Sequence, residues 1–105
     1  MANFETKFEP KNRFQALLHV LFTRKGIDGL ATYLGVAKIT ILKWQARGAV
    51  SAEHVYKVSE YFNLPCKLIA VLNCKDVKVK NELLTSSLHL LKKADVDYII
   101  QYGPR

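Results

Sequence analysis

The chain has 105 residues, of which 50% are hydrophobic and 24% charged, and its formal net charge is +7. This length allows one domain with a single core, and the hydrophobic fraction excludes an intrinsically disordered chain. The longest apolar run, residues 68–72, is far too short to cross a membrane, and residues 1–11 do not resemble a signal peptide. We therefore expect a cytoplasmic protein with no membrane partner, whose excess of bases favours a polyanionic ligand.

The first half of the chain is predicted to form short amphipathic helices. Residues 1–11 are expected to be a flexible N-terminal arm, with Phe4 and Phe8 available to pack elsewhere. After the arm, apolar residues recur at intervals of three and four, which predicts a helix between an N-cap at Asn12 and a stop at Gly26. These apolar residues are Phe14, Leu17, Leu18, Leu21 and Phe22.

Three further helices are expected before Pro65. Asp28 is predicted to cap a helix over 28–34, and Gly35-Val36-Ala37 to form a turn into a helix over 38–47 that ends at Gly48. The side chain of Ala37 has no hydrogen-bonding group to cap this helix, an omission that costs about 1 kcal/mol. A fourth helix is expected to open at Ser51 and to end before Pro65, with Val55, Val58, Tyr61 and Phe62 on its apolar face.

The last forty residues allow more than one interpretation. Residues 65–72 fit a fifth helix or a strand, residues 76–80 an edge strand or a solvated loop, and residues 81–93 a helix. Residues 96–102 are rich in β-formers and apolar on both faces, so they need a cover, and a second copy of the chain is a natural one. The expected fold is mainly α: a compact helical bundle over 12–65 and a C-terminal extension over 66–105, a helix plus a short strand, used for dimerisation.

Residues 27–47 have the pattern of a helix-turn-helix. Ala31 is small enough for two crossing helices to approach closely, and Gly35 accepts the positive φ of a sharp turn. Ile41 and Trp44, one turn apart, are expected to pin the second helix to the first. This arrangement usually presents a helix to the major groove of DNA.

Residues 12–65 resemble the phage Cro-like and Cro/C1-type repressor superfamily. The closest likeness lies in Lys43-Trp44 and in the segment Gly-Ala-Val-Ser-Ala-Glu-His over 48–54. The resemblance implies a sequence-specific transcriptional regulator, a repressor that binds operator DNA as a homodimer and occludes a promoter. It implies that the helix over 38–47 contacts base edges through four residues, Lys38, Ile39, Leu42 and Lys43. It also implies that Thr40, Gln45 and Arg47 contact the flanking DNA backbone. Arg24 and Lys25 would add phosphate contacts.

Two other functions fit the same pattern. Because Ile39 and Leu42 are apolar, the helix over 38–47 and the C-terminal segment could instead bind a protein, as in an antirepressor or an inhibitor of a host complex. An antitoxin would combine DNA binding with a protein partner held by the C-terminal segment. Binding through several lysines falls steeply with salt, whereas an apolar protein contact does not, so salt dependence separates DNA from protein binding.

Catalytic and metal-binding motifs are absent from the sequence. Cys66 and Cys74 are too few and too far apart for a CxxC redox or zinc motif, and we expect reduced thiols. His19, His54 and His89 fall in different predicted helices and form no local ligand pair. No nucleophile motif, phosphate-binding glycine loop or pair of acids at a suggestive spacing is present. We therefore expect no enzyme activity, no metal and no cofactor.

Overall fold

The computed structural model describes residues 9–102, and within this range every regular element is helical. The prediction of a mainly α-helical chain is confirmed, and the described residues contain no strand. The first half forms α2 (Arg13–Lys25), α3 (Asp28–Leu34), α4 (Lys38–Arg47), the 3-10 turn η1 (Ala52–His54) and α5 (Val55–Phe62). The second half forms α6 (Cys66–Ala70), the 3-10 turn η2 (Val71–Asn73), α7 (Val77–Ser87), the 3-10 turn η3 (Leu88–Leu90) and α8 (Lys93–Ile100).

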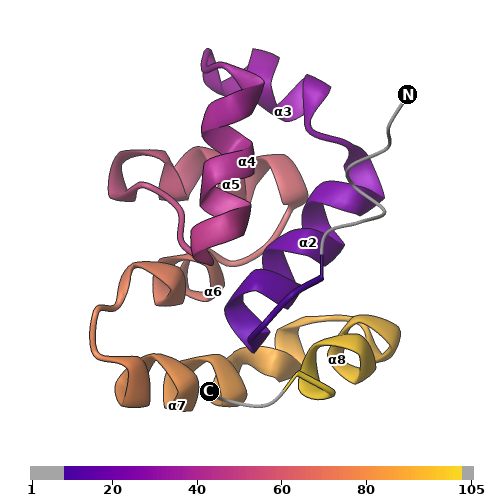
Figure 1. The fold of residues 1–105 in the computed structure, drawn as a ribbon, viewed down its shortest axis with the longest axis vertical. Coiled ribbons are helices and arrows are strands. Elements are labelled where there is room, and N and C mark those ends of the chain that lie inside the picture. Colours follow the sequence, from indigo (N-terminus) through magenta and orange to yellow (C-terminus); the bar gives the residue numbers. More distant parts are fainter. Residues whose placement is uncertain (1–8, 103–105) are drawn as a thin grey trace.

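Helix α2 runs between the helices α3 to α5 above it and the helices α7 and α8 below it (Figure 1). It packs against α4 on one side and against α8 on the other, and its Leu17 and Leu18 are completely buried. The single core cluster draws side chains from both halves, including Trp44 of α4 and Ile99 of α8. Burial of these apolar side chains is the main force that holds the helices together.

The ends of the first helices follow local capping rules with two exceptions. The Asn12 side chain accepts a hydrogen bond from the Gln15 amide at 2.9 Å, and Gly26 ends α2, as predicted. Helix α4 starts at Lys38 with no side-chain cap from Ala37, also as predicted. The predicted cap at Asp28 is wrong, because Asp28 is the first residue inside α3 and its carboxylate pairs with Lys38.

Ser51 is the second exception. It directly precedes η1, as expected of a residue that opens a helix, but its side chain makes no capping bond. Its hydroxyl oxygen instead accepts a hydrogen bond from Trp44 Nε1 at 3.1 Å.

The strands considered for the second half are replaced by helices. The Asp76 carboxylate accepts hydrogen bonds from the amides of Lys78 and Val79 at 3.0 and 3.2 Å, so α7 begins where an edge strand or loop was expected. Residues 96–100, expected to be strand-like, belong to α8. The N-cap at Asp76 and the packing of α8 on α2 outweigh the β-propensity of the valines and isoleucines.

The C-terminal half shares the core of the N-terminal half. Ile99 is completely buried, whereas the next residue, Ile100, is 44% exposed, because neighbouring residues of a helix point to different sides. Leu68, Ile69 and Leu84 also belong to the common core. The apolar C-terminal segment is thus covered within the same chain, and a second copy is not needed to cover it.

The predicted N-terminal arm falls mainly outside the described residues, and Phe4 and Phe8 lie there. Of its last residues, Pro10 is buried and the Lys11 amide donates a hydrogen bond to Gln15 Oε1 at 2.9 Å. None of the described helices is both long enough and apolar enough to cross a membrane.

Candidate nucleic-acid interface

A three-residue turn, Gly35-Val36-Ala37, joins α3 to α4. Gly35 has the left-handed conformation predicted from the sequence, with φ 72° and ψ 33°. The amides of Gly35 and Val36 both donate to the Ala31 carbonyl, at 2.8 and 3.1 Å, which closes the end of α3. A residue with a Cβ adopts this conformation only under strain, so Gly35 sets the direction in which α4 leaves the turn.

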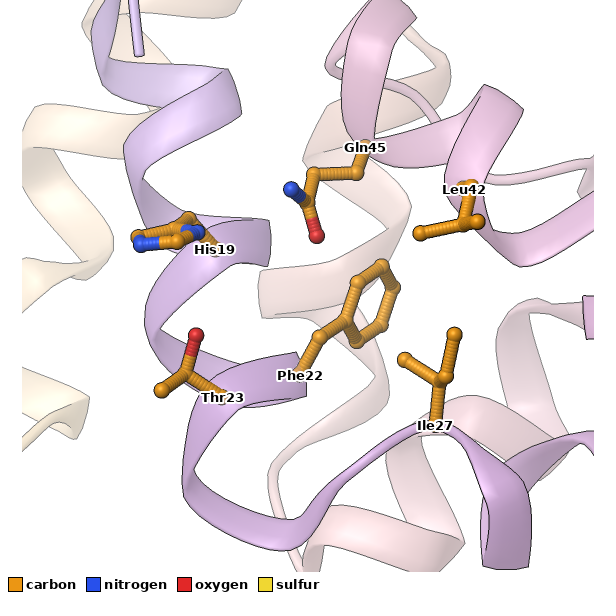
Figure 2. Close-up of a pocket in the computed structure, with 6 residues that line it drawn as sticks. All are labelled: His19, Phe22, Thr23, Ile27, Leu42 and Gln45. Carbon is orange, nitrogen blue, oxygen red and sulfur yellow. The ribbon is translucent and has the colours of Figure 1, made fainter. Parts of the chain in front are cut away.

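The inner face of α4 is anchored in the core. Ile41 is completely buried and Trp44 is 1% exposed, which confirms both as packing residues. Figure 2 shows Leu42 and Gln45 of α4 facing Phe22 of α2 and Ile27. The cavity between them measures about 10 Å³, which is room for one water molecule at most. This side of α4 therefore positions the helix and has no space for a ligand.

Because of this packing, two residues that were predicted to contact DNA face the protein core instead. Gln45 is only 7% exposed and its side chain points toward α2, so it is not placed to reach a DNA backbone (Figure 2). Leu42 is half-buried and packs against the core. Of the two apolar residues expected to contact bases, only Ile39 stands clear of the protein, with 58% of its surface exposed.

The outer face of α4 is exposed and positively charged. Ile39, Lys43 and Arg47 are all exposed and follow one another at intervals of four, so they lie along the same side of the helix. Thr40 is half-buried beside them. Lys43 and Arg47 form no ion pair with any residue between 9 and 102. We call Ile39, Lys43 and Arg47 the outer face of α4.

Lys38 differs from the other bases of α4. Its Nζ lies 3.0 Å from Asp28 Oδ1, and both side chains are exposed, at 60% and 83%. An exposed ion pair of this kind is weak, typically below about 1 kcal/mol, so a phosphate or base edge could compete for the lysine. Lys38 therefore remains available at the start of the helix.

Arg24 and Lys25 are held away from the outer face of α4. The Arg24 guanidinium pairs with the carboxylate of Asp95 on α8. Lys25 Nζ donates to the Tyr61 carbonyl on α5 at 2.9 Å and lies 4.5 Å from the centre of the Tyr61 ring. Both bases are engaged on other elements, so the structure does not bring them together with Lys38, Lys43 and Arg47 as the sequence suggested.

A base from the second half of the chain supports the end of α4. Lys80 of α7 donates to the Gly48 carbonyl at 3.2 Å, and its Nζ lies 4.2 Å from the centre of the Phe14 ring. A cation at a helix C-terminus satisfies free carbonyls and favours the helix dipole. Burial lowers the pKa of Lys80 from its usual value. Sequence reasoning missed this residue because nothing local links it to a helix end 32 positions earlier.

Comparisons of this chain with protein-family models, with curated proteins and with solved structures found no match. Within the described part of the chain, no three His, Cys, Asp or Glu side chains come close enough together to hold a metal ion.

Proposed function

We propose that this chain is a sequence-specific DNA-binding regulator whose helices α3 and α4 form a helix-turn-helix. The observation that carries the proposal is the two-sided character of α4. Its inner side is locked by Ile41 and Trp44, while on its outer face Lys43 and Arg47 are not covered by any element between residues 9 and 102. A rigidly held helix with an exposed basic side suits the DNA major groove.

The outer face of α4 offers a mixture of charged and apolar contacts. Lys43 can donate to guanine O6 and N7, and Ile39 can contact a thymine methyl group. Arg47 at the C-terminal end of the helix, and Lys38 at its start, suit contacts with phosphates. Asp28 is the one acid on the segment from Arg24 to Arg47, so the local field favours a polyanion.

A repressor of this kind would act as a homodimer that occludes a promoter, with its two α4 helices about 34 Å apart in successive major grooves. Since Ile99 is buried within the chain, the dimer contact would need another surface. Helix α7 supplies a candidate, because Val79 and Leu83 are 40% and 43% exposed and lie one turn apart. Val77, at 55% exposed, begins the same helix.

Selection of bound fragments from random DNA tests the proposal directly. We expect a palindromic site whose half-sites are separated by about 10 base pairs. Binding to that site, followed by fluorescence anisotropy, should weaken steeply as salt rises, with about one counterion released per phosphate contact. Failure to retain any DNA at low salt would refute DNA binding.

Replacing Lys43 by alanine is expected to weaken binding to the selected site by about 5- to 150-fold, the range for a lost base contact. Non-specific binding should fall much less. Arg47→Ala, which removes a phosphate contact, should instead weaken both and lower the salt slope by about 1. Lys93→Ala on α8 is the charge-matched control and should change neither. Equal losses of specific and non-specific binding for Lys43→Ala would exclude a base-reading role.

Leu83→Asp is expected to shift the protein from dimer to monomer in sedimentation equilibrium, because it places a charge in an apolar contact. The variant should still fold as a monomer, since Leu83 is already 43% exposed. Thr85→Asp, an exposed position elsewhere on α7, is the control and should leave the dimer intact. If the unmodified chain sediments as a monomer even at high concentration, the proposed homodimer is refuted.

A protein-binding function is the second candidate, and the exposed apolar side chains favour it. Ile39 is 58% exposed, Tyr33 on α3 is 42% exposed and Tyr56 on α5 is 67% exposed. The Tyr33 hydroxyl donates a hydrogen bond to Glu60 Oε1 at 2.5 Å, and this hydrogen bond raises the pKa of Tyr33. A protein partner bound through these apolar side chains would remain bound at high salt, whereas DNA would dissociate.

A further inference from the structure

A second site lies where the C-terminal part of α2 and the end of α5 meet the segment that leads into α8. It is a pocket of about 310 Å³, at the lower end of the range for small-molecule sites. Its apolar wall consists of Leu21, Phe62, Leu64, Leu90 and Leu91. Leu21 is 1% exposed and belongs to the core, whereas the other four are only partly buried. The pocket therefore leaves apolar surface accessible.

The polar groups of this pocket carry an excess of positive charge. Arg24, Lys25 and Lys92 line it together with one carboxylate, that of Asp95. The Asp95 side chain is 10% exposed and is already paired with Arg24. Two positive charges thus remain without a counterion in the pocket.

These bases differ in how firmly they are held. Lys25 is fixed by the Tyr61 carbonyl, at 2.9 Å. Arg24 contacts Asp95 through Nη2, and a guanidinium has five N–H donors in all, so it can bind a second anion. Lys92 makes no hydrogen bond or ion pair through its side chain with the described residues, and it directly precedes α8, where the helix dipole also favours an anion. Lys92 is therefore the base best placed to accept a ligand.

We infer that this pocket binds a small amphiphilic carboxylate, with its apolar chain against the leucines and its carboxylate beside Lys92 and Arg24. A bare inorganic anion would leave the apolar wall in water, and a neutral apolar molecule would leave the bases without a counterion. A carboxylate with an alkyl chain satisfies both surfaces at once. This inference does not depend on DNA binding, because no residue of the outer face of α4 lines the pocket.

Titration of the full chain with octanoate, followed by two-dimensional amide NMR, tests the inference. Saturable shifts are expected at Leu90, Leu91 and Lys92, with a dissociation constant on the order of 1 mM or lower. Octanol and acetate, which keep only the chain or only the charge, should bind at least about tenfold more weakly. Octylammonium, which carries the opposite charge, should not bind in this pocket.

Two neighbouring lysines provide a matched pair of variants. Lys92→Glu is expected to weaken octanoate binding at least about tenfold, because it replaces the attracting charge by a repelling one. Lys93→Glu makes the same change one residue away, at a side chain that is 88% exposed and does not line the pocket. It should leave the affinity within about twofold. Absence of saturable shifts at tens of millimolar octanoate, equal binding of octanol and octanoate, or equal losses in the two variants would overturn the inference.

Discussion

Trp44→Ala is expected to destabilise the protein by about 3–5 kcal/mol, the usual range for truncating a buried tryptophan. Trp44 is 1% exposed, its ring lies 5.3 Å from that of His54, and its Nε1 donates to Ser51. The change leaves a large cavity under α4. The free energy of unfolding of a domain is only about 5–15 kcal/mol in total, so the substitution removes a large part of it.

Urea denaturation followed by far-UV circular dichroism measures this loss. Trp44 is the single tryptophan of the chain, so tryptophan fluorescence cannot follow the variant. Ser51→Ala, which removes only the hydrogen-bond acceptor, should cost about 1 kcal/mol and separates the hydrogen bond from the packing. A loss below about 1 kcal/mol for Trp44→Ala would show that Trp44 does not anchor α4.

Ile99→Ala is expected to cost about 2–5 kcal/mol, although the residue lies in a segment that the sequence suggested was an accessory extension. Ile99 is completely buried in the common core, and α8 packs on α2. Since α2 also packs against α4, the loss of apolar contacts between α8 and α2 should destabilise the whole molecule. The neighbouring Ile100→Ala is the matched control, and because Ile100 is 44% exposed it should change stability by less than about 0.5 kcal/mol.

Native-state hydrogen exchange distinguishes a shared core from a separable extension. With a shared core, Ile99→Ala should lower the protection of amides in α2, α4 and α8 together, because they open in one cooperative unit. If α8 alone lost protection while α2 and α4 kept theirs, the C-terminal half would be an independent element. That result would restore the division at residue 66 that the sequence favoured.

The candidate DNA interface was only partly predictable. Lys43, Arg47 and Ile39 are exposed on α4, where a contact with DNA requires them to be. Contacts of Gln45 and Leu42 with DNA were expected because the family resemblance implies contacts at those positions, yet both side chains turn toward Phe22 of α2 (Figure 2). The spacing of residues along a helix gives their angular positions, but the side that becomes buried depends on where its neighbours pack.

The second pocket was not predictable at all from the sequence. It needs Arg24 from α2, Asp95 from α8 and Phe62 from α5 to lie together, and no local pattern links three such distant segments. Two of its bases, Arg24 and Lys25, were expected to contact DNA phosphates because they precede the helix-turn-helix pattern in the sequence. Their actual partners, Asp95 and Tyr61, are distant in the chain.

The sequence by itself determined where the helices of the first half begin and turn. Asn12, Gly26, Gly35 and Gly48 act through backbone conformations and hydrogen bonds that reach no more than five residues, so they can be read from neighbours in the chain. Tertiary structure alone decided that residues 96–100 are helical, that Ile99 is covered within the chain and which side of α4 is left open. Those outcomes depend on the burial of apolar surface between distant segments, and that free energy outweighs the β-propensity of the individual residues.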